Sequence, residues 1–567
     1  MSRDTLSIVD LDESERRVLM SCSGVMSLSD HVARIHERTR MPRESIDNVV
    51  GKLAGSGLIR PVHGVRGSDG RSGTAGTACD VVVITADRPA ALTRCLASLV
   101  RDNERATLRR VVVVDGSQRC ADNNRSAVRQ CGLASVEYFG REEAMALRSE
   151  LVVAGFPSDV VAFGLTPGSI GCNRNLATLI TAGNDVVMVD DDVVLDPWVS
   201  PSRSDGVIYS GHRDLREWEF FSSRRLALEG LCRASTSVIR AHNEVLNRRL
   251  SALVANEPLG PALRDACVHA VAAVGEGRDP TVRVTVAGLA GDSGRYCPYR
   301  LLLLNGEVQR RLMSDGTALA NALGSREIRH IAAKTLVTHD PGACASYCFG
   351  VANRSPLLPF MPIGRGEDTV FGVMVGAIDD DVLFGHLPVG IVHDSDRPSC
   401  FGEDRMPSAR QVRLSEFILG TVSDLGLSSS PSSKDERSAS LVNRLKELGS
   451  LGDKDLRAAV EEVGLDLRAR HIRTLEAGLA RKDCPRHWRT EASTYRDALR
   501  ESAASGRMSV LAEFGSPDRA DRDIIQGTRD FFNLYAELLR HWPEIWSRAV
   551  SMRHTTVMTA DRYGRVR

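Results

Sequence analysis

The sequence predicts an α/β protein whose central sheet is largely parallel, and two observations carry that prediction. Between residues 79 and 425, short β-branched runs such as DVVVITA and RRVVVVDGS alternate with amphipathic helical segments. Strands that are apolar along their whole length are typical of a parallel sheet buried on both faces. Stretches rich in Gly and Ser flank this region, which indicates that separate units precede and follow it.

Length and composition restrict the class of protein. At about 100–200 residues per domain, 567 residues favour three or four folded units. The chain has 73 basic and 73 acidic residues, so no surplus of charge indicates a nucleic-acid partner, an anionic membrane surface or disorder. With 42% hydrophobic and 26% charged residues, collagen-like, low-complexity and small disulfide-rich proteins are excluded.

The sequence contains no sign of a membrane span or a secretory signal. Its longest apolar runs are far shorter than the roughly 18–20 residues that cross a bilayer. The first residues, MSRDTLSIVDLDESERR, lack a charged segment followed by an apolar one. The 13 cysteines are scattered without a CxxC pair, which argues against a disulfide framework and against a zinc ribbon. We therefore expect a cytoplasmic protein.

Residues 1–63 show a pattern of strand, helix, Ser-capped helix, longer amphipathic helix and the start of a β-wing. This is a winged-helix pattern, and the segments LDES, SLSDHVARI and VVGKLAGSGLI resemble PqqD-like domains. The resemblance implies a peptide partner, because such domains bind a leader peptide by adding its strand to a sheet edge. Two alternatives stay open: a DNA-binding winged helix, although RESIDNVVGKLAGSG has few basic residues for phosphates, and a packing or dimerisation module.

Two stretches predict linkers that divide the chain. The first, residues 64–78, has frequent Gly and no hydrophobic period, and the second, residues 426–440, contains LSSSPSS. Residues 79–425 then form the α/β unit, and residues 441–567, which show only helical periodicity, form an all-α domain.

Polar residues follow the apolar strands of the central region. Asp87 and Arg88 follow the first, Asp115 follows the second, and Asp190, Asp191 and Asp192 follow VVMV. The carboxyl ends of parallel strands are where open sheets bind ligands. Three adjacent carboxylates repel one another unless a cation or several donors compensate them, and oxygen ligands of this kind suit Mg²⁺ or Mn²⁺. The alternative for the triplet is a solvated loop that caps a helix.

The triplet resembles the DXD motif of the family 2 glycosyltransferases, which have the GT-A fold, a Rossmann-like core that binds nucleotide sugars. Further segments occur in the order of that family over residues 80–400. They are VVVITADRP, VVVVDGS, GCNRNLA, GRGEDTVFG and VGIVHDSDR. The resemblance implies a donor site made by Thr85, Asp87, Arg88, Asp115, Arg174, Asn175, Asp190 and Asp191.

The same resemblance implies a divalent metal cofactor, Mn²⁺ or Mg²⁺, held by Asp190, Asp192 and His393. It also implies a catalytic base at the helix start GEDT, where we expect Asp368 to act and Glu367 to accompany it. An inverting transfer needs a carboxylate that reaches the proton of the acceptor on the side opposite the departing nucleotide. Each residue also has a structural alternative: a turn cap for Asp115, a surface ion pair for Arg174, a core position for His393 and a helix-dipole partner for the acidic pair.

Compared with compact family members, a long segment separates Asp192 from Asp368, so we expect an insertion at about residues 200–360. It contains GLAGDSGRYC, in which Asp292, Ser293 and Arg295 are candidates for binding the acceptor. A tight structural turn explains this segment equally well, and GDSG without a supporting His and Asp pattern does not indicate a serine protease.

An aromatic stripe lies in the C-terminal helical region. Its residues recur at helical spacing and are Phe531, Leu534, Tyr535, Leu538, Trp542 and Trp546. Packing against the α/β unit or a second subunit is the expected role, and binding a sugar or a partner helix is the alternative.

Together these patterns predict a metal-dependent glycosyltransferase that moves a sugar from a nucleotide sugar, UDP-linked by preference, to an unknown acceptor. A ribosomally made peptide bound by residues 1–63 and a natural-product or cell-envelope glycan are both possible acceptors. One alternative is a nucleotidylyltransferase, although ITADRP is not its Gly-rich basic loop. Another is a non-catalytic regulator that reads peptide or DNA through its winged helix. The nucleotide, the sugar and the oligomeric state stay open.

Overall fold

The structure is a computed structural model that describes most of the 567 residues. The described residues are 10–22, 28–56, 58–59, 78–103, 108–133, 135–209, 218–254, 279–340, 344–402, 412–426, 433–504, 511, 513–514 and 521–554. All thirteen strands within them belong to one mixed sheet, whose main path runs β3-β2-β1-β4-β12-β9-β13-β11-β6.

The first half of the sheet is parallel, as the sequence predicted. Its strands pair in parallel in the order β3-β2-β1-β4. They are β1 (Asp80–Thr85), β2 (Arg110–Asp115), β3 (Val136–Phe139) and β4 (Val186–Asp190). The helices between them are α4 (Pro89–Asn103), α5 (Ala121–Gln130), α6 (Arg141–Val153), α7 (Ser158–Leu165) and α8 (Ile170–Ile180). This alternation of strands and helices is typical of an open parallel sheet covered by helices on both faces.

The second half mixes strand directions. β12 (Cys348–Val351) lies antiparallel between β4 and β9 (Thr281–Asp292), and β13 (Val382–His393) pairs parallel with β9. The remaining strands extend or flank this half: β5 (Val193–Val199), β6 (Val207–Tyr209), β7 (Glu219–Phe220), β8 (Cys232–Arg233), β10 (Glu327–His330) and β11 (Thr335–Thr338). The prediction of an insertion at residues 200–360 is therefore wrong in part, because β9 and β12 are central strands of the main sheet.

Helices cover both faces of the sheet and form two cores. Alternate residues of a strand point to opposite faces. Val82 and Ile84 of β1 accordingly join one core with α6, α7 and α8, while Val81 and Val83 join the other with α4. The described helices on the second half are α9 (Arg224–Leu228), α10 (Val238–Val245), α11 (Leu250–Val254), α14 (Gly306–Ser314), α15 (Gly316–Gly324), α16 (Glu367–Ile378) and a 3₁₀ helix at Pro298–Leu303.

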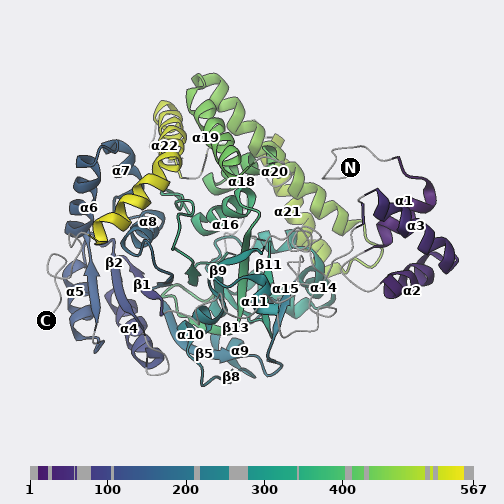
Figure 1. Cartoon of the computed structure of the whole chain (residues 1–567), viewed down its shortest axis with the longest axis horizontal. Helices are drawn as coiled ribbons and strands as arrows, with labels where there is room; N and C mark the ends of the chain where they lie inside the picture. Colours follow the sequence, from purple (N-terminus) through teal and green to yellow (C-terminus); the bar gives the residue numbers. More distant parts are fainter. Residues whose placement is uncertain are drawn as a thin grey trace.

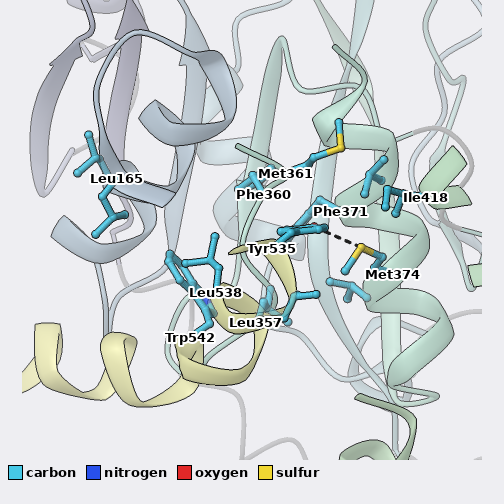
Figure 2. Close-up of a cluster of buried hydrophobic side chains, with 14 of the residues drawn as sticks. Leu165, Leu357, Phe360, Met361, Phe371, Met374, Ile418, Tyr535, Leu538 and Trp542 are labelled. Atoms are coloured by element: carbon cyan, nitrogen blue, oxygen red, sulfur yellow. Dashed lines mark hydrogen bonds between the residues drawn. The ribbon is translucent and has the colours of Figure 1, made fainter. Parts of the chain in front are cut away.

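The C-terminal helices pack directly on the α/β unit. They are α18 (Leu414–Asp424), α19 (Lys434–Ser450), α20 (Asp453–Leu479), α21 (Arg486–Ala504) and α22 (Asp521–His554), and α22 runs beside α7 and α8 (Figure 1). Most of the aromatic stripe is buried in the same core as the sheet. Tyr535, Leu538 and Trp542 face α7 and α16, and the Tyr535 hydroxyl lies 3.4 Å from Met374 Sδ (Figure 2). The packing role expected for the stripe is therefore the one the structure has.

Linker boundaries differ from those predicted. Residues 64–77 of the first linker lie outside the described residues. α19 begins at Lys434, inside the second predicted linker of residues 426–440, because Ser433 and Glu436 form a capping box that starts the helix there. Helix formers after Ser433 therefore override the Ser-rich composition.

Residues 10–56 form a small helical unit with its own core. Its helices are α1 (Glu13–Ser21), α2 (Leu28–Thr39) and α3 (Arg43–Gly55), which bury Val18, Ile35, Ile46 and Leu53 among themselves. The unit lies at the end of the molecule opposite α5 and α6 (Figure 1). The strands that the winged-helix prediction requires fall on residues 1–9 and 60–63, outside the described residues. Among the described helices, none has the length and apolar character needed to cross a membrane.

Candidate active site

The site forms where the order of the parallel strands reverses. β1 pairs with β2 on one side and β4 on the other, and the chain reaches these neighbours in opposite directions. Such a switch point opens a crevice at the carboxyl ends of the strands. Ile84 at the end of β1 lies opposite Asp190 at the end of β4, so the polar residues that follow the two strands meet.

Arg88 links two members of the aspartate triplet. Its guanidinium nitrogens lie 2.6 Å from Asp191 Oδ1 and 2.7 Å from Asp192 Oδ2. Thr85 donates its hydroxyl to Asp191 Oδ2 at 2.7 Å. Burial raises the pKa of Asp191 to about 7, although Arg88 opposes this shift. Thr85 and Asp191, both predicted to contact the donor, are buried and hydrogen-bonded to each other.

Asp192 and His393 meet across the crevice. His393 Nε2 lies 3.1 Å from Asp192 Oδ1, and Nδ1 lies 2.5 Å from the backbone oxygen of Asp292. Burial works against ionisation, but His393 and Arg88 lower the pKa of Asp192, and Asp192 raises the pKa of His393. Nδ1 carries a proton, because it donates to the backbone oxygen of Asp292. The lone pair of Nε2 then faces the Asp192 carboxylate, and the two require a cation between them, either a proton or a metal ion.

This pair fits a divalent cation, but the third predicted ligand points elsewhere. Asp190 Oδ1 accepts from Arg174 at 2.8 Å. Burial raises the pKa of Asp190, and Arg174 counteracts this rise. Within the described part of the chain, no cluster of three or more His, Cys, Asp or Glu side chains is arranged as a metal site. Two of the three predicted ligands therefore meet, and the third is held by an arginine.

Arg174 is the centre of a second cluster of charges. It lies on α8, and its side chain has 0% exposure. Besides Asp190, its Nη2 donates to Ser346 Oγ at 2.7 Å, and its Nε donates to Glu367 Oε1 at 3.3 Å. The guanidinium also lies over the ring of Phe349, 5.2 Å from its centroid. Arg174, predicted as part of the donor site, is thus an internal cation that compensates buried carboxylates.

The acidic pair begins α16, as predicted, but its two members differ. Glu367 is buried, and burial, together with the charge of Asp368, raises its pKa to about 7. Asp368 is only half-buried. Its Oδ2 accepts from the Ser346 backbone N–H at 3.1 Å and from Ser346 Oγ at 2.9 Å, and its Oδ1 accepts from the Thr369 N–H at 2.7 Å. Asp368 is thus the carboxylate of the pair that a substrate can reach.

Other predicted donor residues build the loops around the crevice. Asp115 is buried and accepts from the Ser117 N–H at 2.8 Å and the Tyr138 hydroxyl at 2.6 Å. Asp87, in the left-handed region with φ of 54°, accepts from the N–H groups of Arg119 and Cys120. The side-chain amide of Asn175, also predicted to contact the donor, is buried and bonds the backbone of Gly164 and Phe360.

The predicted acceptor segment lies beside His393. β9 ends at Asp292, next to the end of β13. Asp292 pairs with Arg326 at 3.0 Å, and Ser293 accepts from the Tyr347 hydroxyl through its backbone oxygen at 2.5 Å. Arg295 lies over the ring of Trp218, 4.1 Å from its centroid. The tight turn offered as the alternative is present, at Gly294 with φ of 65°, and its backbone supports the site.

Sequence reasoning missed Ser346, Tyr347 and Arg326. The Tyr347 ring lies 4.6 Å from the ring of His393, and its backbone oxygen accepts from the Asp190 N–H. These residues precede or begin strands in a segment without a charged or Gly-rich motif. Only the pairing of β12 with β4 and β9 brings Ser346 and Tyr347 into the site, and no local pattern could have indicated this.

Comparison with known proteins finds no matching family model and no matching curated protein. Among solved structures, a mycobacterial protein is 14% identical and covers 66% of this chain and 82% of its own, with a TM-score of 0.28. TarS 1–349 of S. aureus is 12% identical and covers 76% and 91%, with a TM-score of 0.26. Glucosyl-3-phosphoglycerate synthase of Mycobacterium tuberculosis, in complex with Mn²⁺, UDP and glucosyl-3-phosphoglycerate, is 14% identical and covers 66% and 88%, with a TM-score of 0.26. TM-scores this low carry no argument about the function of this chain.

Proposed function

We propose that the chain is a metal-dependent, inverting glycosyltransferase that takes a sugar from a nucleotide sugar, UDP-linked by preference. One observation carries the proposal. At the switch point of a parallel sheet, the buried Arg174 contacts Asp190, the first residue of the aspartate triplet, and Glu367 of the acidic pair, whose second member, Asp368, is half-buried. A sugar-nucleotide transfer needs a cationic region for the diphosphate and a separate carboxylate for the acceptor proton.

The donor side has groups suited to a diphosphate. Arg88 is 42% exposed and offers a guanidinium group at the crevice. Asp192 and His393 are the residues that would hold Mn²⁺ or Mg²⁺, with Asp190 nearby. When bound, such an ion would neutralise the charge that develops on the departing nucleoside diphosphate.

Asp368 is the proposed base. The acceptor hydroxyl attacks the anomeric carbon, its proton passes to Asp368, and the bond from that carbon to the diphosphate oxygen breaks with its electron pair on the nucleotide. Glu367 does not compete for this role, because it is buried and bound to Arg174. The segment from Asp292 to Arg295 lies next to His393 and is the proposed wall of the acceptor side.

The test is the thermal stability of the purified chain with UDP-, GDP-, dTDP- and CDP-sugars, each with and without Mn²⁺. A ligand that binds only the folded state raises the midpoint of unfolding. We expect a metal-dependent rise with one donor, which Asp192→Asn abolishes. Asp185→Asn is the matched control. Asp185 directly precedes β4, at the end of the strand away from Asp192, and pairs with Arg354.

No rise with any sugar nucleotide would contradict the proposal. A rise with nucleoside triphosphates alone would favour a nucleotidylyltransferase instead. An equal loss in Asp185→Asn and Asp192→Asn would show that the effect is a general loss of stability.

A further inference from the structure

Ser346 lies between the buried arginine and the proposed base. It is buried, directly before Tyr347 and the central strand β12. Its hydroxyl oxygen is 2.7 Å from Arg174 Nη2 and 2.9 Å from Asp368 Oδ2, and its backbone N–H is 3.1 Å from the same carboxylate oxygen. One residue thus contacts both the cation and the proposed base.

The direction of these hydrogen bonds follows from chemistry. A guanidinium group can only donate, so Ser346 Oγ must accept from Arg174. The single hydroxyl proton of Ser346 is then free for Asp368, whose oxygen lies at hydrogen-bond distance. A hydroxyl that accepts from a cation is polarised and becomes a better donor to a carboxylate.

Arg174 connects this relay to the donor side. The same Nη2 that contacts Ser346 also donates to Asp190 at 2.8 Å. Because Arg174 has no exposed surface, solvent cannot replace any of these bonds. The carboxylate that ends β4 and the carboxylate near the start of α16 are therefore held by one buried cation, directly for Asp190 and through Ser346 for Asp368.

We propose that Ser346 is a positioning residue for the transfer reaction: it orients the Asp368 carboxylate that accepts the proton. This inference rests on the proposed function, in which Asp368 is the base. This positioning role differs from a purely structural one. Loss of the Ser346 hydroxyl removes a donor to the charged carboxylate of Asp368, whereas the backbone N–H stays.

The experiment uses the full chain and the nucleotide sugar found by the thermal assay, with water as the acceptor. Water attacks the anomeric carbon, its proton passes to Asp368, and the nucleoside diphosphate is released and measured. Ser346→Ala should lower the maximal rate about tenfold or more, since base catalysis contributes roughly 10²–10⁴-fold.

A matched control exists in the chain. Ser251 on α11 is also buried and also contacts an aspartate, Asp279, through both its N–H and its hydroxyl. Ser251→Ala should leave the rate unchanged. Ser346→Thr keeps a hydroxyl and should restore much of the rate. Ser346→Cys fills the space that alanine leaves empty, and its weak thiol donor should lower the rate in the same direction as alanine.

Each outcome has a definite reading. Donor binding with a wild-type rate in Ser346→Ala and Ser346→Cys would overturn the role of Ser346 while leaving the proposed function in place. An unchanged rate in Asp368→Asn would overturn the assignment of the base and this inference with it. Absence of donor binding in the wild-type chain would overturn the proposed function itself.

Discussion

Two arginines in the candidate site each contact two carboxylates, but their surroundings differ. Arg88 is 42% exposed and links Asp191 to Asp192, whereas Arg174 is fully buried and links Asp190 to Glu367. A charge near solvent can exchange its partners for a ligand or water at low cost, while a buried charge cannot lose a partner without a large penalty. The Arg88 side of the site can therefore exchange its partners for a ligand, whereas the Arg174 side is fixed.

Removing the buried arginine should have the largest effect on stability. Arg174→Met leaves Asp190 and Glu367 buried without their cation. Breaking a buried ion pair costs about 3–5 kcal/mol of the free energy of unfolding. Urea unfolding at neutral pH measures this loss. A loss no larger than that of Arg88→Met would contradict the distinction between the two arginines.

The buried side should also make stability depend on pH. The pKa of Glu367 is raised from 4.5 to about 7, mainly by burial. Between these values the folded protein keeps a proton that the unfolded chain has released, so stability falls as pH rises through that window. The loss attributable to Glu367 is at most about 3 kcal/mol, at about 1.4 kcal/mol per pKa unit.

Unfolding of the wild-type chain and of Glu367→Gln at pH 5 and pH 8 measures this contribution. The wild-type chain should lose more stability between the two pH values than the variant, in which that proton cannot be released. Parallel losses in both proteins would show that Glu367 does not titrate in this window.

The packing that places Arg174 offers a further test. A Cβ at Gly171 on α8 would collide with the backbone oxygen of Met361, in the segment that leads to Glu367. Gly171→Ala should therefore cost about 1–3 kcal/mol and weaken the reaction, because α8 and α16 can no longer approach each other. Gly324→Ala, which meets no atom within 4 Å, is the control. Equal stability of the two variants would show that this close approach is dispensable.

The exposed arginine should give the smallest change in stability and the clearest response to metal. Arg88→Ala should cost about 1 kcal/mol, the upper end for ion pairs near solvent, because Arg88 is 42% exposed. Mn²⁺ should raise the melting temperature of this variant, because Asp191 and Asp192 have then lost Arg88, and it should not rescue Arg174→Met. Stabilisation of both variants by Mn²⁺, or of neither, would contradict the proposed difference between the Arg88 side and the Arg174 side of the site.

The sequence predicted the parallel strands and the residues that end them, because apolar runs followed by Asp or His are local signals. Asp190, Asp192, His393 and Asp368 all lie at the ends or starts of elements where we expected them. Burial could not be predicted in the same way. Whether Arg174 or Asn175 faces a ligand depends on the backbone of Phe360 and on Ser346, which are distant in sequence.

The antiparallel half was the part least accessible to prediction. β9 and β12 are central strands, yet they lie in the region that we predicted to be an insertion. Their partners are set by crossovers of the chain, which local periodicity does not reveal. The start of α19 shows the opposite case. A capping box at Ser433 was visible in the sequence, but the surrounding Ser-rich composition obscured it.

The central claim, a metal-assisted nucleotide site at Asp192 and His393, is tested most directly by Mn²⁺ binding in the presence of UDP, followed by electron paramagnetic resonance. We expect UDP-dependent Mn²⁺ binding to the wild-type chain and to Asp185→Asn, and its loss in Asp192→Asn and His393→Ala. Unchanged Mn²⁺ binding in Asp192→Asn, or no binding to the wild-type chain, would contradict the account.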